Sequence, residues 1–116
     1  MITKHNILQM VETAYHALLD KKGEKAAILD ISGISVICDY FLIVTGNNEN
    51  HIKTLTEAVE ESLHKLGKTA NHKEGTSTGW VLIDFGDFIV HIFSKEGRDF
   101  YDIEHIWGDA EVVAVI

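Results

Sequence analysis

Residues 80–93 read WVLIDFGDFIVHIF, two runs of strand-forming residues on either side of Gly86-Asp87. Glycine tolerates the positive φ that the first central position of a type II′ turn requires, so this pair predicts a two-residue β-hairpin. Such a turn fixes the pairing register. Trp80 is expected opposite Phe93, and the remaining residues of the two runs pair in order toward the turn.

The two faces of this hairpin differ in kind, because side chains alternate along a strand. One face is wholly apolar and predicts a core surface: Val81, Ile83, Phe85, Phe88, Val90 and Ile92. The other face mixes large rings with ionisable groups: Trp80, Leu82, Asp84, Ile89, His91 and Phe93. Two interpretations are open. The mixed face meets a partner or substrate, or a helix covers it and its polar groups are satisfied internally.

Regular patterns on both sides of the hairpin predict further elements. Helices are predicted over residues 3–22, where Thr3 is a candidate cap, over residues 48–66, and from a cap at Asp99 through the apolar positions Phe100, Ile103, Ile106 and Trp107. Strands are predicted over residues 25–31, 39–46 and, weakly, 68–74. The order predicts an α/β fold whose mixed sheet of about five strands carries helices on its faces. The apolar tail 112–116 is a candidate for an added edge strand.

Length and charge limit the classes of function. A chain of 116 residues predicts one domain, residues 1–116. Its net charge of −8 argues against direct, sequence-specific nucleic-acid binding, because that affinity comes largely from Lys and Arg. The charge fits a basic protein partner, although it fits plain solubility equally well.

Location is indicated by the apolar runs and the cysteine count. No apolar run approaches the roughly 20 residues that span a bilayer, so no membrane partner is expected. The first residues lack the pattern of a signal peptide. The single cysteine, Cys38, excludes an intrachain disulfide and indicates a reducing, cytoplasmic location. A buried thiol is favoured over a nucleophile at this position.

No pattern of catalytic or metal-binding residues stands out. The seven histidines form no i,i+4 pair on a predicted helix and have no Cys-x-x-Cys partner. The nucleophile elbow and both glycine-rich phosphate motifs are missing. Asp84 and Asp87 are separated by the turn, whereas two-metal chemistry needs carboxylates that converge. We therefore expect no catalysis, no metal and no cofactor.

Three motifs resemble those of the ribosomal silencing factors, also called the Iojap family. Residues 39–46, DYFLIVTG, followed by His51 are similar to the first motif, residues 74–93 to the central motif, and residues 98–107 to the closing helix. The motifs occur in order over nearly the whole chain. Departures are minor: Ile103 and Ile106 stand where the family has leucine.

This resemblance implies a fold similar to nucleotidyltransferases without their chemistry, and a role in repressing translation. Members bind a basic protein of the large ribosomal subunit, number fourteen in the universal numbering, at the face where the small subunit docks. Occupying that face blocks an intersubunit bridge, so the implied mechanism is steric. Members are often seen paired, which implies a homodimer when the protein is free.

Candidate partner-binding residues come from the mixed face of the hairpin and from the closing helix. Large rings dominate interface hot spots, so Trp80 and Phe93 are expected first, then Leu82, Asp84 and His91. Two residues of the closing helix are weaker candidates, with core packing as an equal alternative: Tyr101 and Trp107.

Two other functions are weighed against silencing. One is a divergent metal-dependent nucleotidyltransferase that uses Asp84 with Asp39 or Glu104 as metal ligands. The other is an oligomerising scaffold whose aromatic face is a self-interface.

Overall fold

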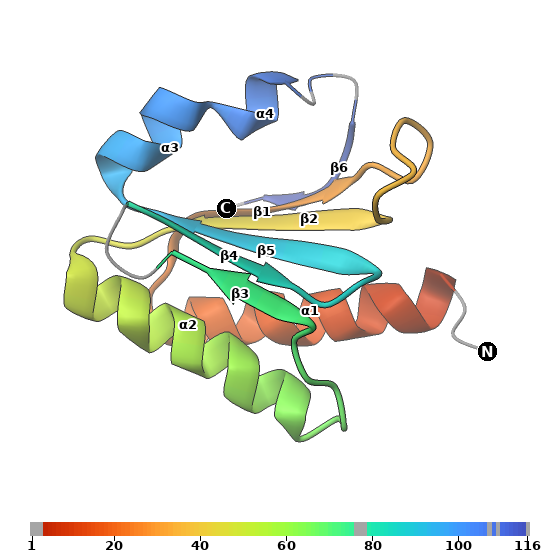
Figure 1. Ribbon diagram of the computed structural model, residues 1–116, viewed down its shortest axis with the longest axis horizontal. Coiled ribbons are helices and arrows are strands. Elements are labelled where there is room, and N and C mark those ends of the chain that lie inside the picture. Colours follow the sequence, from red (N-terminus) through yellow and green to blue (C-terminus); the bar gives the residue numbers. More distant parts are fainter. Residues whose placement is uncertain (1–3, 76–78, 107, 109, 116) are drawn as a thin grey trace.

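The computed structural model describes residues 4–75, 79–106, 108 and 110–115. Its centre is a six-stranded sheet in the order β3-β4-β5-β2-β1-β6. The strands are β1 (Glu24–Asp30), β2 (Tyr40–Thr45), β3 (His72–Glu74), β4 (Trp80–Asp84), β5 (Phe88–Phe93) and β6 (Glu111–Val115). The helices are α1 (Lys4–Asp20), α2 (Glu49–His64), α3 (Lys95–Tyr101) and α4 (Ile103–Ile106). α1 and α2 cover one face of the sheet, and α3 and α4 lie over the other (Figure 1).

The sheet is mixed, as predicted. β2 and β5 run parallel at its centre, and the other four pairs are antiparallel. All six residues of β2 are buried, which confirms that this apolar run is covered on both faces. The apolar tail supplies the sixth strand, since β6 pairs with β1 at one edge.

The predicted hairpin register is confirmed at every pair from Trp80–Phe93 to Asp84–Ile89. The Phe85 amide donates to the Phe88 carbonyl at 3.0 Å, which closes the two-residue turn. Gly86 has φ of 92°, the positive value that a type II′ turn needs at this position. Local turn chemistry therefore determines which side chains share each face.

The wholly apolar face of the hairpin lies in the larger core, as predicted. Its six side chains are at most 4% exposed and pack in one cluster with α1 and α2. Six helix residues of that cluster are completely buried: Val11, Ala14 and Leu18 of α1, and Leu55, Val59 and Leu63 of α2. Apolar burial at this interface is the main contribution to the stability of the sheet–helix layer.

The N-cap of α2 lies where the sequence predicts the helix to begin, whereas the N-cap of α3 does not. Asn48 caps α2, with its side-chain oxygen accepting the His51 amide at 2.8 Å. The predicted cap at Asp99 is wrong: Ser94 caps α3 by accepting the Gly97 amide at 2.9 Å, and Asp99 lies inside the helix. The predicted cap Thr3 lies outside the described residues.

The closing helix is two helices rather than one. Asp102 has φ of 44° and ψ of 48°, the left-handed conformation that ends a helix. The chain then turns into the four-residue α4. Within the described part of the chain, no helix has both the length and the apolar character to cross a membrane.

Candidate protein-binding site

The mixed face of the hairpin forms a second, smaller core beneath α3 and α4. Its buried members come from three strands, from the loop after β1 and from α4: Leu29, Ile31, Cys38, Phe41, Ile43, Ile89, Phe93 and Ile103. Trp80, Leu82 and Ala110 pack against this cluster and are partly buried. The structure thus supports the interpretation in which helices cover most of the mixed face.

Four rings form the centre of this region, which we call the aromatic cluster: Trp80, His91, Phe93 and Tyr101. Trp80 of β4 stacks on Phe93 of β5, with ring centroids 5.3 Å apart and planes 25° apart. Tyr101 at the end of α3 lies against Trp80 at 4.6 Å and against Phe93 at 5.9 Å. The indole N–H of Trp80 donates to Nδ1 of His91 at 3.1 Å.

Exposure divides the predicted contact residues. Trp80, Leu82 and Asp84 are half-buried, and Tyr101 is 36% exposed. The prediction that Phe93 and His91 lie exposed on a contact face is wrong, because they are only 1% and 3% exposed. Tyr101 and Trp80 lie over Phe93 instead. Trp107 lies outside the described residues.

Phe100, one of the apolar positions predicted for the closing helix, is an exposed aromatic residue. Its side chain is 81% exposed, and its ring meets Tyr101 edge-on at 5.1 Å. Phe100 and Tyr101 fall on either side of Gly97 on a helical wheel, so spacing alone does not decide which one turns inward. Together with Trp80 and Leu82 they form a surface that we call the aromatic rim: Trp80, Leu82, Phe100 and Tyr101.

Arg98 fixes the helices that carry this rim. Its Nε and Nη2 atoms donate to the two carboxylate oxygens of Glu104 at 2.6 and 2.9 Å, and Nη1 donates to the Thr45 hydroxyl at 3.0 Å. The hydrogen bond from Arg98 lowers the pKa of Glu104 below its ordinary value. The guanidinium therefore connects α3, α4 and β2.

Two of the three side chains proposed as metal ligands, Asp84 and Glu104, are engaged in contacts within the fold. The Asp84 carboxylate accepts the Gly86 amide at 2.7 Å, and Glu104 is held by Arg98. Among the described residues, no three or more His, Cys, Asp or Glu side chains converge as a metal site would need.

Cys38 is a buried thiol, as expected. Its Sγ donates to the Tyr40 carbonyl at 3.4 Å. Burial raises its pKa to about 11, with smaller contributions from the charges of Asp84 and Asp39. A thiol with this pKa is protonated at neutral pH and is a poor nucleophile.

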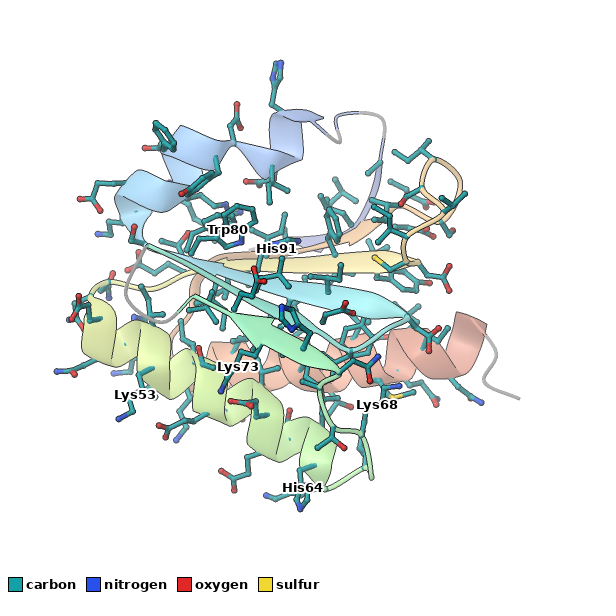
Figure 2. All side chains as sticks on the ribbon, in the orientation of Figure 1. Lys53, His64, Lys68, Lys73, Trp80 and His91 are labelled. Carbon is teal, nitrogen blue, oxygen red and sulfur yellow. The ribbon has the colours of Figure 1, made fainter. Side chains whose placement is uncertain are left out.

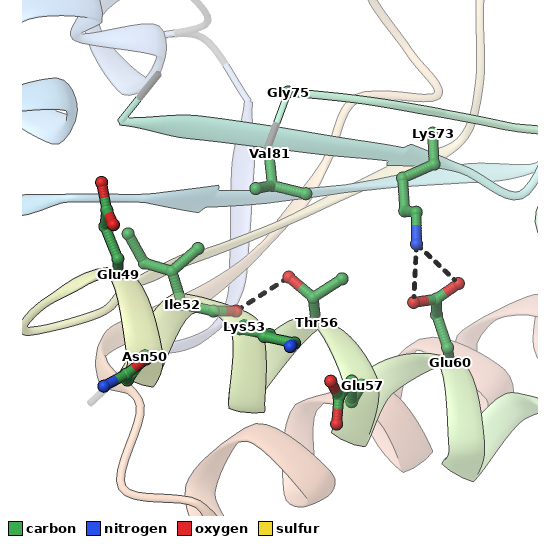
Figure 3. A pocket seen from close by; sticks show the side chains of 10 residues that line it. All are labelled: Glu49, Asn50, Ile52, Lys53, Thr56, Glu57, Glu60, Lys73, Gly75 and Val81. Carbon is green, nitrogen blue, oxygen red and sulfur yellow. Dashed lines mark hydrogen bonds and ion pairs between the residues drawn. The ribbon is translucent and has the colours of Figure 1, made fainter. Parts of the chain in front are cut away.

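A separate cavity of about 410 Å³ lies between α2 and the β3–β4 side of the sheet (Figure 3). Ten residues line it: Glu49, Asn50, Ile52, Lys53, Thr56, Glu57, Glu60, Lys73, Gly75 and Val81. Lys73 reaches across it to the Glu60 carboxylate at 3.1 and 3.4 Å, and the Thr56 hydroxyl donates to the Ile52 carbonyl. These pairings leave fewer polar groups for a ligand, so the aromatic rim is the better candidate site.

Comparisons with known proteins agree with the motifs. Residues 4–115 match the family described as ribosomal silencing factor during starvation. The chain is similar to the ribosomal silencing factor of Halalkalibacterium halodurans, at 38% identity over 90% of this chain and 91% of that protein. The corresponding Bacillus subtilis protein is 36% identical over 90% of each chain.

A solved structure shares the fold. A crystal structure of a Chromobacterium violaceum protein superposes with a TM-score of 0.84 at 34% identity, covering 88% of this chain and 86% of that one. The arrangement of sheet and helices is therefore shared along most of both chains.

Proposed function

The chain belongs to the ribosomal silencing factor family, and from this premise we propose that it represses translation by binding the large ribosomal subunit and blocking its joining to the small subunit. The proposed partner is the basic bridge protein of that subunit, number fourteen in the universal numbering. The proposed compartment is the cytoplasm. Family membership points to a regulator rather than an enzyme.

The aromatic rim is the observation that carries the choice of surface. Phe100 and Tyr101 present accessible ring surface, and the ring of Tyr101 contacts both Phe100 and Trp80. Trp and Tyr are enriched in interface hot spots because they bury much area at low entropic cost. Half-buried Leu82 extends the apolar surface along β4.

Charge supports a basic partner. The net charge of −8 attracts a positively charged protein and repels free nucleic acid. Asp84, half-buried on the mixed face, is the carboxylate we assign to a Lys or Arg of the partner. Charges of this kind act mainly on association rate and specificity.

The proposed mechanism needs no reaction. The molecule has principal extents of 37, 32 and 24 Å. A rigid body of this size, bound at the face where the subunits meet, excludes the opposing subunit by volume. Subunit joining then stops as long as the factor remains bound.

The free protein is proposed to be a homodimer through β6. This edge strand presents Val112 and Val113, which are 57% and 41% exposed, and described strands pair with it only on the β1 side. An exposed apolar edge strand is a surface on which a second chain can add.

Sedimentation of purified subunits tests the proposed function. A saturating excess of the protein is expected to leave the subunits separate under conditions in which they otherwise join. Phe100→Ala is expected to weaken binding by about 2 kcal/mol, as for a hot-spot residue, with an unchanged melting temperature because the ring is exposed.

Leu66→Ala is the matched control for this variant. Leu66 is also exposed, at 55%, but follows α2 on the opposite layer, so its truncation is expected to change neither binding nor stability. Equal subunit joining with and without the protein would refute the proposed function. Equal binding by Phe100→Ala and Leu66→Ala would refute the proposed surface.

A further inference from the structure

His91 of β5 is placed to hold Trp80 rather than to touch a partner. Both residues lie on the face of the sheet that α3 and α4 cover (Figure 2). The imidazole is 3% exposed, and its Nδ1 accepts the indole N–H at 3.1 Å. A buried acceptor, Nδ1 of His91, is thus paired with the only polar atom of the Trp80 indole, the ring that we assign to the interface.

Stacking alone does not fix the orientation of this indole. Phe93 and Tyr101 pack against the ring at 5.3 and 4.6 Å, which confines its plane. Such contacts hardly distinguish a ring from the same ring turned over, since both present a similar apolar face. The hydrogen bond does distinguish them, because it requires the N–H edge to point toward His91.

The acceptor role requires a neutral imidazole. Because Nδ1 accepts, the proton of the ring lies on Nε2, which is buried without a hydrogen-bond partner among the described residues. Phe41 meets the ring edge-on at 4.6 Å, and Phe93 lies parallel to it at 6.1 Å. Burial in these apolar surroundings lowers the pKa of His91 to about 4, so the ring is neutral at physiological pH.

We propose that His91 is a positioning residue for the partner-binding surface: its Nδ1 fixes the orientation of Trp80, and large-subunit binding depends on this acceptor although the imidazole itself does not touch the partner. The inference rests on the proposed function for its binding readout. It assigns His91 a role different from that of a contact residue.

Two substitutions separate positioning from core packing. His91→Phe keeps a ring in the cluster, removes a buried unpaired N–H, and removes the acceptor. His91→Asn keeps an acceptor, because the side-chain oxygen of asparagine lies close to the position of Nδ1, but it leaves space in the core. The melting temperature of His91→Asn is therefore expected to be the lowest of the three proteins, with that of His91→Phe above it.

Binding is expected in a different order. His91→Phe is expected to bind the large subunit about ten-fold more weakly than the unsubstituted protein, because the indole loses the hydrogen bond that holds it in the binding orientation. The affinity of His91→Asn for the large subunit is expected to stay within about three-fold of that of the unsubstituted protein, because its hydrogen bond is kept with less ideal geometry. Binding that follows the order of stability, or full binding by His91→Phe, would overturn the proposal.

A spectroscopic measurement tests the same contact without the ribosome. The indole N–H resonance of Trp80, identified by its loss in Trp80→Phe, is expected to exchange slowly with solvent in the unsubstituted protein and in His91→Asn. It is expected to exchange faster in His91→Phe. Unchanged exchange in His91→Phe would refute the positioning role, whereas failure of the unsubstituted protein to bind subunits would refute only the proposed function.

Discussion

Arg98 is a single residue that joins the two closing helices to a strand more than 50 residues earlier in the chain. Its side chain is 10% exposed and binds Glu104 through two parallel hydrogen bonds while also donating to Thr45. A planar guanidinium can do this because its donors form a rigid fork, which lysine lacks. The residue therefore holds the covering helices on the aromatic cluster.

Arg98→Gln is expected to destabilise the fold by about 1–2 kcal/mol at pH 7, the range for a charge-assisted pair whose carboxylate is partly solvated. Glu104 is 40% exposed, so water replaces part of what the guanidinium supplies. Chemical denaturation measures the difference. Lys95→Gln is the control: its ammonium lies 4.0 Å from Glu24 with 63% of the side chain exposed, so little change is expected.

The same variant has a predicted pH dependence. The pKa of Glu104 is lowered in the folded state, so the unfolded state binds more protons as the solution is acidified. The stabilisation from Arg98 is complete above the ordinary pKa of 4.5 and is lost as pH falls through the lowered folded value. The difference in the free energy of unfolding between the unsubstituted protein and Arg98→Gln should therefore become smaller below pH 4.5. A difference in the free energy of unfolding that stays constant until Glu104 is fully protonated would contradict the assigned Arg98–Glu104 pair.

At the scale of elements, the hairpin and the closing helices differ in how far sequence predicts them. A two-residue turn determines the register, so each facing pair from Trp80 to Asp84 follows from the Gly86-Asp87 turn and the two runs beside it. The burial of Phe93 does not follow, because it depends on how the next helix, α3, folds back over the sheet. That docking needs Gly97, where a Cβ would collide with the Gly79 carbonyl oxygen.

The predicted start of α3 is wrong because two cap residues lie close together and a tertiary contact decides between them. Ser94 and Asp99 are both good N-cap residues, and the sequence offers both within one short segment. Tertiary structure decides between them: the Ser94 amide donates to the Gly79 carbonyl at 3.0 Å, which anchors the start of α3 beside β4. Propensity identified a helix here, and packing set its first residue.

Ser94→Ala is expected to cost about 1 kcal/mol of stability, because the Gly97 amide loses its acceptor. Asp99→Ala should stay within about 0.5 kcal/mol, as for a surface residue inside a helix. Paired thermal unfolding curves measure both variants. A larger loss for Asp99→Ala than for Ser94→Ala would show that the cap lies where the sequence first suggested.

At the scale of the whole molecule, the two faces of the sheet have separate uses. The face under α1 and α2 holds the larger core, and the face under α3 and α4 holds the smaller core and the aromatic rim. Neither face is then available for self-association without loss of core or rim. Two edges of the described sheet remain, β3 and β6. β3 has only three residues, all polar, whereas β6 presents exposed valines, so β6 is the better place for a second copy to add strand to strand.

Val113→Lys is expected to convert the proposed dimer into a monomer, because a charged side chain on an edge strand opposes pairing with another chain. Light scattering at about 50 µM, where weak dimers with standard interfaces are populated, measures the mass. Leu66→Lys places the same charge on the α2 layer and should leave the dimer intact. A monomeric mass for the unsubstituted protein would refute the proposed dimer while leaving the silencing role open.

The pairing of β6 with β1 also has a consequence for biosynthesis. Ala27 lies beside Val115, so two strands made at widely separated times must meet. At about 5–20 residues per second, the residues between them take roughly 4–18 s to be added. Throughout that interval the edge of β1 that faces β6 has no β6 strand to pair with. The six-stranded sheet is therefore complete only after β6 has been synthesised, which makes this edge the last part of the sheet to form.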